Sequence, residues 1–225
     1  GAVQEVQRTC LDLFPPTQTR LYTGCFHGMG HGLALWEKLN APNALKDCDL
    51  LETTYRPFCY DGVFMEYGSH ASKAANSAGD PWEFCNSLDK QYQDHCARYQ
   101  ALLLSHTSGW NVPVIALACL QATFPNAAET CLAGLGRMVS QKEERDAGRI
   151  FQSCTTIEEE SGKYLCILYA AQEIVFQQYK NWQETTATLC AKLPVSWQEK
   201  CSQKIKGGVS IKNWLDLTKS FTIVS

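Results

Sequence analysis

The sequence lacks the patterns of several large protein classes. It has no block of Lys and Arg, and its net charge of −3 with a pI near 6.0 makes a nucleic-acid partner unexpected. Its longest apolar stretch, around residues 112–120, is too short to cross a bilayer, so no membrane span is predicted. The opening residues Gly1-Ala2-Val3 do not form a signal peptide, and we interpret them as a mature start or an expression scar.

Several short functional motifs are also absent. The chain contains no nucleophile elbow, phosphate loop, haem-attachment motif or zinc-finger spacing, so no organic cofactor is predicted. It has no Asn-x-Ser/Thr glycosylation site, which favours a bacterial periplasmic or secreted protein. No two cysteines are separated by only two residues, which argues against a cytosolic metal–thiolate protein.

Cysteine, by contrast, is abundant and regularly spaced. Twelve cysteines form six pairs that recur about every 35 residues, a period typical of repeat architectures. The even count predicts disulfides and an oxidising compartment, so we expect a secreted or periplasmic protein. The predicted bridges are Cys10–Cys25, Cys48–Cys59, Cys85–Cys96, Cys119–Cys131, Cys154–Cys166 and Cys190–Cys201.

The residues around each cysteine pair predict a helical hairpin. After the second cysteine, the first, fourth, fifth and eighth positions are mostly apolar or small, as at Tyr60, Val63, Phe64 and Tyr67. This spacing is typical of one buried stripe on a helix. Turn residues between the cysteines predict that one helix ends just after the first cysteine and another begins near the second. Facing cysteines of two antiparallel helices can then reach disulfide distance.

The fold class predicted is all-α, with six disulfide-stapled hairpins in a single helical-repeat domain, 1–225. The hairpins can form an open α-solenoid or a closed α/α toroid, and the sequence leaves both open. The period is similar to that of tetratricopeptide and Sel1-like repeats, but the residue signatures of these families are absent, so no function follows from it. The predicted units are approximately 3–38, 39–76, 77–110, 111–143, 144–180 and 181–209, with 210–225 as a C-terminal cap.

A candidate metal site lies in the first two units. His27 and His31 are four residues apart, so they share one helix face and could bind a metal with both imidazoles. His27 is expected near a helix start, where the helix dipole disfavours the imidazolium. In the next unit Asp61 occupies the repeat position of His27, and Glu66 follows close by, so either carboxylate could complete a three-ligand set.

The metal could be zinc, copper or iron. Met29 and Met65 nearby favour copper slightly, because thioethers are soft ligands. Met65 occupies the repeat position of His31. The glycines of the first site helix, Gly28, Gly30 and Gly32, are interpreted as points of close helix–helix contact.

Two other functions are compatible with the sequence. In a metal-free enzyme, His27 or His31 would act as the general base and Glu66 as the general acid, while Arg98 or Arg137 would hold a polar or anionic small substrate. A closed ring would bring Gln172 and Glu173 to the same cavity. Alternatively, the protein is an interaction scaffold for a protein or peptide partner. His70 is interpreted as a surface residue at a helix end, and His95 and His106 are assigned no role.

Overall fold

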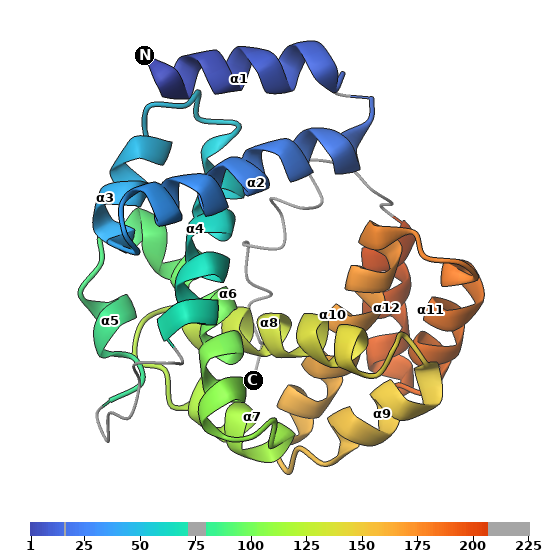
Figure 1. The fold of residues 1–225 in the computed structure, drawn as a ribbon. Coiled ribbons are helices and arrows are strands. Elements are labelled where there is room, and N and C mark those ends of the chain that lie inside the picture. The colour runs from blue at the N-terminus through green and yellow to red at the C-terminus, as the bar shows by residue number, and fades with distance from the viewer. Residues whose placement is uncertain (16, 72–79, 207–225) are drawn as a thin grey trace. The chain divides into compact units, whose positions relative to one another are not determined.

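A computed structural model describes residues 1–15, 17–71 and 80–206 of the chain (Figure 1). Within these residues the protein contains twelve helices and no strand, which confirms the all-α prediction. The predicted cap, 210–225, and the predicted boundary between 76 and 77 lie outside the described residues. The helices are α1 (Ala2–Leu13), α2 (Thr19–Trp36), α3 (Ala41–Cys48), α4 (Arg56–Ala71), α5 (Glu83–Asn86), α6 (Lys90–Thr107), α7 (Val112–Leu120), α8 (Ala127–Lys142), α9 (Ala147–Thr155), α10 (Glu160–Gln177), α11 (Trp182–Ala191) and α12 (Val195–Lys206).

Each odd-numbered helix is joined to the next even-numbered helix by one of the six disulfides, with Cα–Cα distances of 5.4 to 5.8 Å. The first helix of every hairpin ends at its cysteine or shortly after it, as predicted. The second helix begins about one turn or more before its cysteine, earlier than predicted. Because α2 starts at Thr19, His27 lies in its third turn, and the expected effect of the helix dipole on His27 is wrong.

Three of the connections between hairpins use the same turn. Two successive residues adopt positive φ, and the next residue is Asn or Asp, whose side chain accepts a hydrogen bond from the backbone N–H three residues later. That side chain caps the following helix. The two residues with positive φ therefore reverse the chain direction, and the Asn or Asp that follows them caps the first helix of the next hairpin. The pairs are Lys38–Leu39, Gly109–Trp110 and Glu144–Arg145, followed by Asn40, Asn111 and Asp146.

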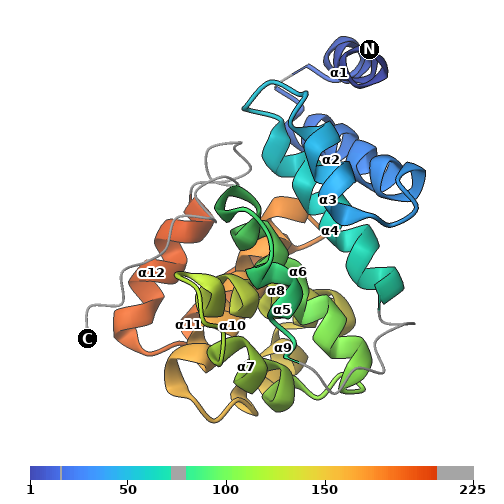
Figure 2. The ribbon, with the colours of Figure 1, turned by 90° about the vertical axis from the view of Figure 1, so that its left-hand side faces the viewer.

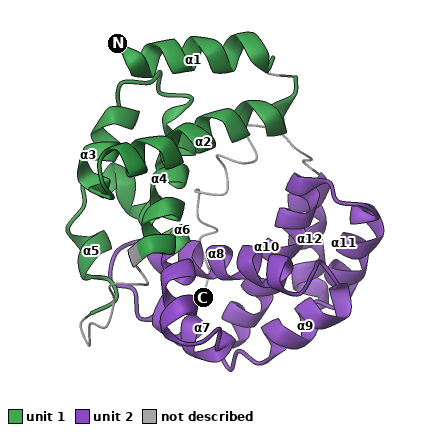
Figure 3. Ribbon diagram, in the orientation of Figure 1, with its two compact units in different colours: residues 1–99 green, residues 100–225 purple. Residues whose placement is uncertain are grey.

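The chain divides into two compact units, residues 1–99 and 100–225, with the division inside α6 (Figure 3). In the first unit the most extensive helix packing is between α2 and α4, and in the second it is between α8 and α10 (Figures 1 and 2). The single domain and the choice between solenoid and toroid stay predictions. In the part of the chain that the structure describes, no helix is both long and apolar enough to cross a membrane.

Helices α2 and α4 touch backbone to backbone at two glycines. A Cβ added to Gly30 would overlap the carbonyl oxygen of Cys59, and one added to Gly62 would overlap the carbonyl oxygen of His27. By contrast, an added Cβ at Gly28 or Gly32 would meet open space. The interpretation of close contact is therefore confirmed for Gly30 and is wrong for Gly28 and Gly32. This crossing sets the distance between the histidines of α2 and the side chains of α4.

We expect Gly30→Ala and Gly62→Ala each to destabilise the protein by about 1–3 kcal/mol, because the added methyl group forces the two helix backbones apart. The matched controls Gly28→Ala and Gly32→Ala should be neutral or stabilise by up to about 1 kcal/mol, since alanine favours a helix more than glycine does. Chemical unfolding with the disulfides intact measures all four. If the substitutions at Gly30 and Gly62 destabilised the protein no more than those at Gly28 and Gly32, the close backbone contact between α2 and α4 would be contradicted.

Candidate functional site

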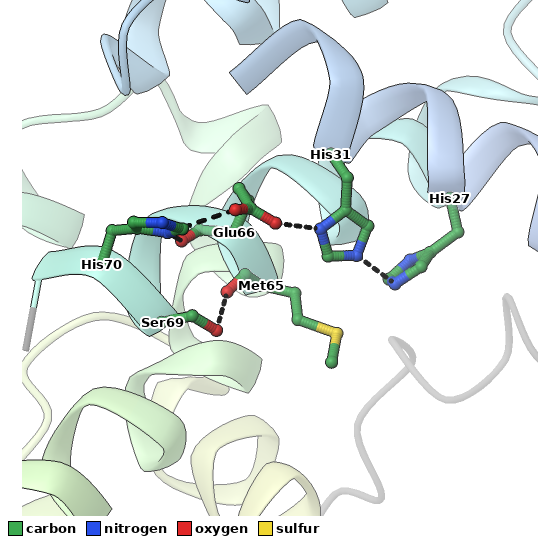
Figure 4. A network of polar contacts seen from close by, with 6 residues as sticks. All are labelled: His27, His31, Met65, Glu66, Ser69 and His70. Carbon is green, nitrogen blue, oxygen red and sulfur yellow. Dashed lines mark hydrogen bonds and ion pairs between the residues drawn. The ribbon is translucent and has the colours of Figure 1, made fainter. Parts of the chain in front are cut away.

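The two histidines of α2 and a glutamate of α4 form a continuous array of polar contacts (Figure 4). The Nε2 atoms of His27 and His31 are 3.2 Å apart, and the Nδ1 atom of His31 is 2.5 Å from an Oε2 oxygen of Glu66. His31 therefore lies between an imidazole and a carboxylate, each contacting a different ring nitrogen. The side chains of His31 and Glu66 are 28% and 16% exposed, so the array is open to solvent at its edge.

These contacts determine which ring nitrogen carries each proton. Glu66 is an acceptor when ionised, so His31 donates to it from Nδ1–H. In neutral His31 the Nε2 atom then carries a lone pair, and His27 donates to it from its own Nε2–H. The carboxylate thus fixes the tautomer and the orientation of His31, and it turns the His31 lone pair toward His27.

A further histidine of α4 belongs to the same array. The Nδ1 atom of His70 lies 3.1 Å from Oε1 of Glu66 and 3.0 Å from the Glu66 backbone carbonyl. His70 was interpreted as a surface residue only, although its i,i+4 spacing from Glu66 was a signal of this contact. Met65 lies beside Glu66, and Figure 4 shows its thioether extending toward the side on which the two α2 imidazoles meet.

The Asp61 side chain is held in a buried cluster with two residues of α6, and His27 is close enough to help lower the Asp61 pKa. One of its oxygens lies 2.6 Å from Nδ1 of His95, and the other accepts a hydrogen bond of 3.0 Å from Nη1 of Arg98. Asp61 is fully buried, and burial opposes its ionisation. The charges of Arg98 and His95 outweigh this effect, so the Asp61 pKa is lowered from its usual value.

A third polar cluster joins α4 and α6 to the end of α3. Tyr60 and Tyr92 each donate a phenolic hydrogen bond to the carboxylate of Asp49. Burial, reinforced by these hydrogen bonds to an anion, raises the pKa of Tyr92 to about 12 and that of Tyr60 as well. Both phenols therefore stay protonated and keep donating at neutral pH.

The structure brings together part of the predicted site. His27, His31 and Glu66 are joined by the contacts described above, whereas both oxygens of Asp61 are directed to His95 and Arg98. Among the described residues, no group of three His, Cys, Asp or Glu side chains is arranged to hold a metal ion. The predicted three-ligand set is therefore not assembled.

The two arginines predicted to hold a substrate both contact carboxylates. Arg98 bonds Asp61, and Arg137 lies 3.3 Å from Glu173 in the second unit. Gln172 and Glu173 are both buried in α10. His95 is a partner of Asp61 that the sequence does not reveal, because its position directly before Cys96 carries no signal. The signal that could have led to it was Asp61 itself, because a buried carboxylate requires cationic or hydrogen-bonding partners.

Comparisons of the chain with protein-family models, with curated proteins and with solved structures each found no match.

We expect Asp61→Asn to destabilise the protein by about 3–5 kcal/mol at neutral pH, because it leaves the buried Arg98 and His95 without the carboxylate. The Asp61 pKa is lower in the folded chain, so its stabilising effect is present above the usual value of 3.8 and is lost as the pH falls below it. The difference between variant and wild type should shrink over that acidic range. Chemical unfolding as a function of pH measures it.

Asp12→Asn is the control for this experiment, since Asp12 is exposed. It should change the free energy of unfolding by less than about 0.5 kcal/mol at any pH. An Asp61→Asn variant as stable as this control at neutral pH would show that the buried cluster does not stabilise the fold.

Proposed function

We propose that this protein is an extracytoplasmic helical-repeat protein that binds a transition-metal ion through the Nε2 atoms of His27 and His31. The observation that carries the proposal is the 3.2 Å separation of these two atoms, at the partly exposed end of an array that continues to Glu66. The six disulfides are consistent with an extracytoplasmic protein.

The separation of the two nitrogens supports a shared metal ion. Two imidazoles bound to one tetrahedral ion at about 2.0–2.1 Å have nitrogens about 3.3 Å apart. A neutral His31 whose Nδ1 proton is held by Glu66 would present an Nε2 lone pair to the metal. His27 must shift its proton from Nε2 to Nδ1 or release it. Metal binding would therefore replace the hydrogen bond between the two histidines and leave the helices where they are.

Glu66 has a different role in this proposal from the one predicted. Its Oε2 atom contacts the far nitrogen of His31, so it orients a ligand and does not itself bind the metal. Carboxylates commonly support metal-binding histidines in this way. Asp61 is left out of the ligand set, because binding a metal would require it to give up its bonds to His95 or Arg98.

The chemistry of the third ligand favours copper. Asp61 is engaged elsewhere, and Glu66 contacts the far nitrogen of His31. Met65 occupies the repeat position of His31, and its thioether extends to the side of Glu66 on which the two imidazoles lie (Figure 4). Thioether sulfur is a soft ligand that selects Cu(I) over zinc or ferrous iron. We infer a set of two imidazoles and one thioether, with the remaining position left to an exogenous ligand. Copper is thereby preferred to the zinc and iron alternatives.

A metal-free acid–base function is the second candidate, and the 2.5 Å contact between His31 and Glu66 favours it. A carboxylate that holds one imidazole nitrogen prepares the other as a proton acceptor, which is the logic of a hydrolase dyad. In this candidate His31 is the general base, and His27 is a donor that must turn away before a substrate proton can approach.

The test is metal binding by protein purified without a chelator or a histidine tag. Wild type should bind one Cu(I) ion, and His27→Ala and His31→Ala should each lose it. Met65→Leu should weaken Cu(I) more than Zn(II), and Glu66→Gln should weaken the metal about 10- to 100-fold. His106→Ala, at an exposed position in the last turn of α6, is the matched control and should bind as wild type does.

Mass spectrometry of the metal content and competition with a chromophoric chelator measure these affinities. Wild type that binds neither copper, zinc nor iron when each is offered would overturn the metal function. Turnover that is retained in metal-free wild type but lost in a folded His31→Ala variant would favour the acid–base candidate instead.

A further inference from the structure

The helix crossing that forms the site occurs again in the second unit. Helices α8 and α10 also pack closely, and a Cβ added to Gly136 would overlap the carbonyl oxygen of Cys166 and approach the amide of Ala170, although Tyr169 stands at the position of Gly62. Gly30 has the same relation to Cys59 and Val63. The equivalence holds along the chain, since Cys131 follows Cys25 by 106 residues (131 − 25) and Cys166 follows Cys59 by 107 (166 − 59).

The carboxylate of the site has a counterpart at this second crossing. Glu173 lies seven positions after Cys166, as Glu66 lies seven after Cys59. Across the crossing, Arg137 takes the position of His31, and its Nε atom is 3.3 Å from Oε2 of Glu173. On the same helix Gln177 takes the position of His70 and donates a hydrogen bond of 3.1 Å to Oε1.

The two carboxylates differ in the chemistry of their partners. An imidazole exchanges protons and can present a lone pair, whereas a guanidinium stays charged and has only donors. Ala133 stands where the first unit has His27, so no second imidazole is present there. Gln141 adds a third donor to Glu173 at 3.0 Å, and the Glu173 side chain is only 6% exposed. The second crossing is therefore a closed ion pair with no atom available to a metal.

We propose that the chain contains two copies of one two-hairpin module, built on α2 and α4 and on α8 and α10, and that the residue at position 31 or 137 determines whether the module binds metal or is a structural clamp. Histidine at this position opens the carboxylate array to a metal ion, and arginine closes it. The metal part of this inference rests on the proposed function above. The equivalence of the modules rests on the geometry of the two crossings alone.

Exchanging the residues between modules tests the inference. His31→Arg should abolish Cu(I) binding and yet keep the thermal midpoint of metal-free protein close to that of wild type, because the arginine can pair with Glu66 as Arg137 pairs with Glu173. His31→Ala removes the imidazole 2.5 Å from Oε2 of Glu66 and leaves the carboxylate with only the longer contact from His70, so it should lower the midpoint. Ala133→His combined with Arg137→His should raise the Cu(I) content from one ion per chain to two, with the second ion bound more weakly because Gln172 stands at the position of Met65.

Each outcome decides a separate question. Wild type with one ion and a folded double variant that also binds one ion would overturn the role of position 137. Wild type with no ion overturns the proposed function and, with it, the metal part of this inference. The comparison of the thermal midpoints of His31→Arg and His31→Ala uses metal-free protein and does not depend on whether the double variant folds. If His31→Arg lowers the midpoint as much as His31→Ala does, the equivalence of the two modules is overturned.

Discussion

The local disulfide of each hairpin is the constraint on which the rest of the structure depends. Helices α3, α5, α7 and α9 have only four to nine residues, and isolated helices of this length are unstable in water. Each bridge closes a loop of 11 to 15 residues, which contributes on the order of 2–3 kcal/mol in the chain-entropy model. The bridge also fixes which face the second helix turns toward its neighbours. Side chains counted from the second cysteine therefore recur at equivalent places.

Polar side chains at these equivalent places differ in how deeply they are buried, and therefore in how strongly they depend on partners within the protein. The fully buried Asp61 is ionised only because Arg98 and His95 are beside it, so this cluster fixes the packing of α4 against α6. His31 and Glu66 are closer to solvent, and water can replace part of what either loses when the other moves. A metal ion or a proton taken up at this partly exposed array would therefore cost less stability than one taken up at Asp61.

The hairpins and their disulfides could be predicted because both depend on local spacing. The bridged cysteines are 11 to 15 positions apart, and the apolar stripe begins at the second cysteine of each unit. The pair His27 and His31 could also be predicted, since i,i+4 spacing places them on one face of α2. The start of α2 could not, because the turn before Thr19 contains no cap side chain that marks it.

The partner of Asp61 could not be predicted for a different reason. Repeat register treats Asp61 as equivalent to His27, yet the Asp61 carboxylate contacts α6, which belongs to the third hairpin. Register along the chain specifies a face of a helix but does not specify which neighbour that face meets. For the same reason the open Gly28 and Gly32 looked identical to Gly30 in sequence, although only Gly30 meets the backbone of α4.

The carboxylate at the α8–α10 crossing, Glu173, has stronger partners than Glu66 has at the α2–α4 crossing. Arg137 gives Glu173 a charge that does not depend on pH, and Gln141 and Gln177 add two neutral donors. At the first crossing a neutral His31 supplies no charge, and Leu35 stands at the position of Gln141. The contact from Nδ1 of His70 to Oε1 of Glu66 replaces part of this support. A module that used its carboxylate only as a clamp would gain nothing from this exchange, because every substitution weakens the hold on Glu66. Under the proposed function, a metal ion bound at Nε2 of His31 would offset this loss, because it would take the place of the contact with His27.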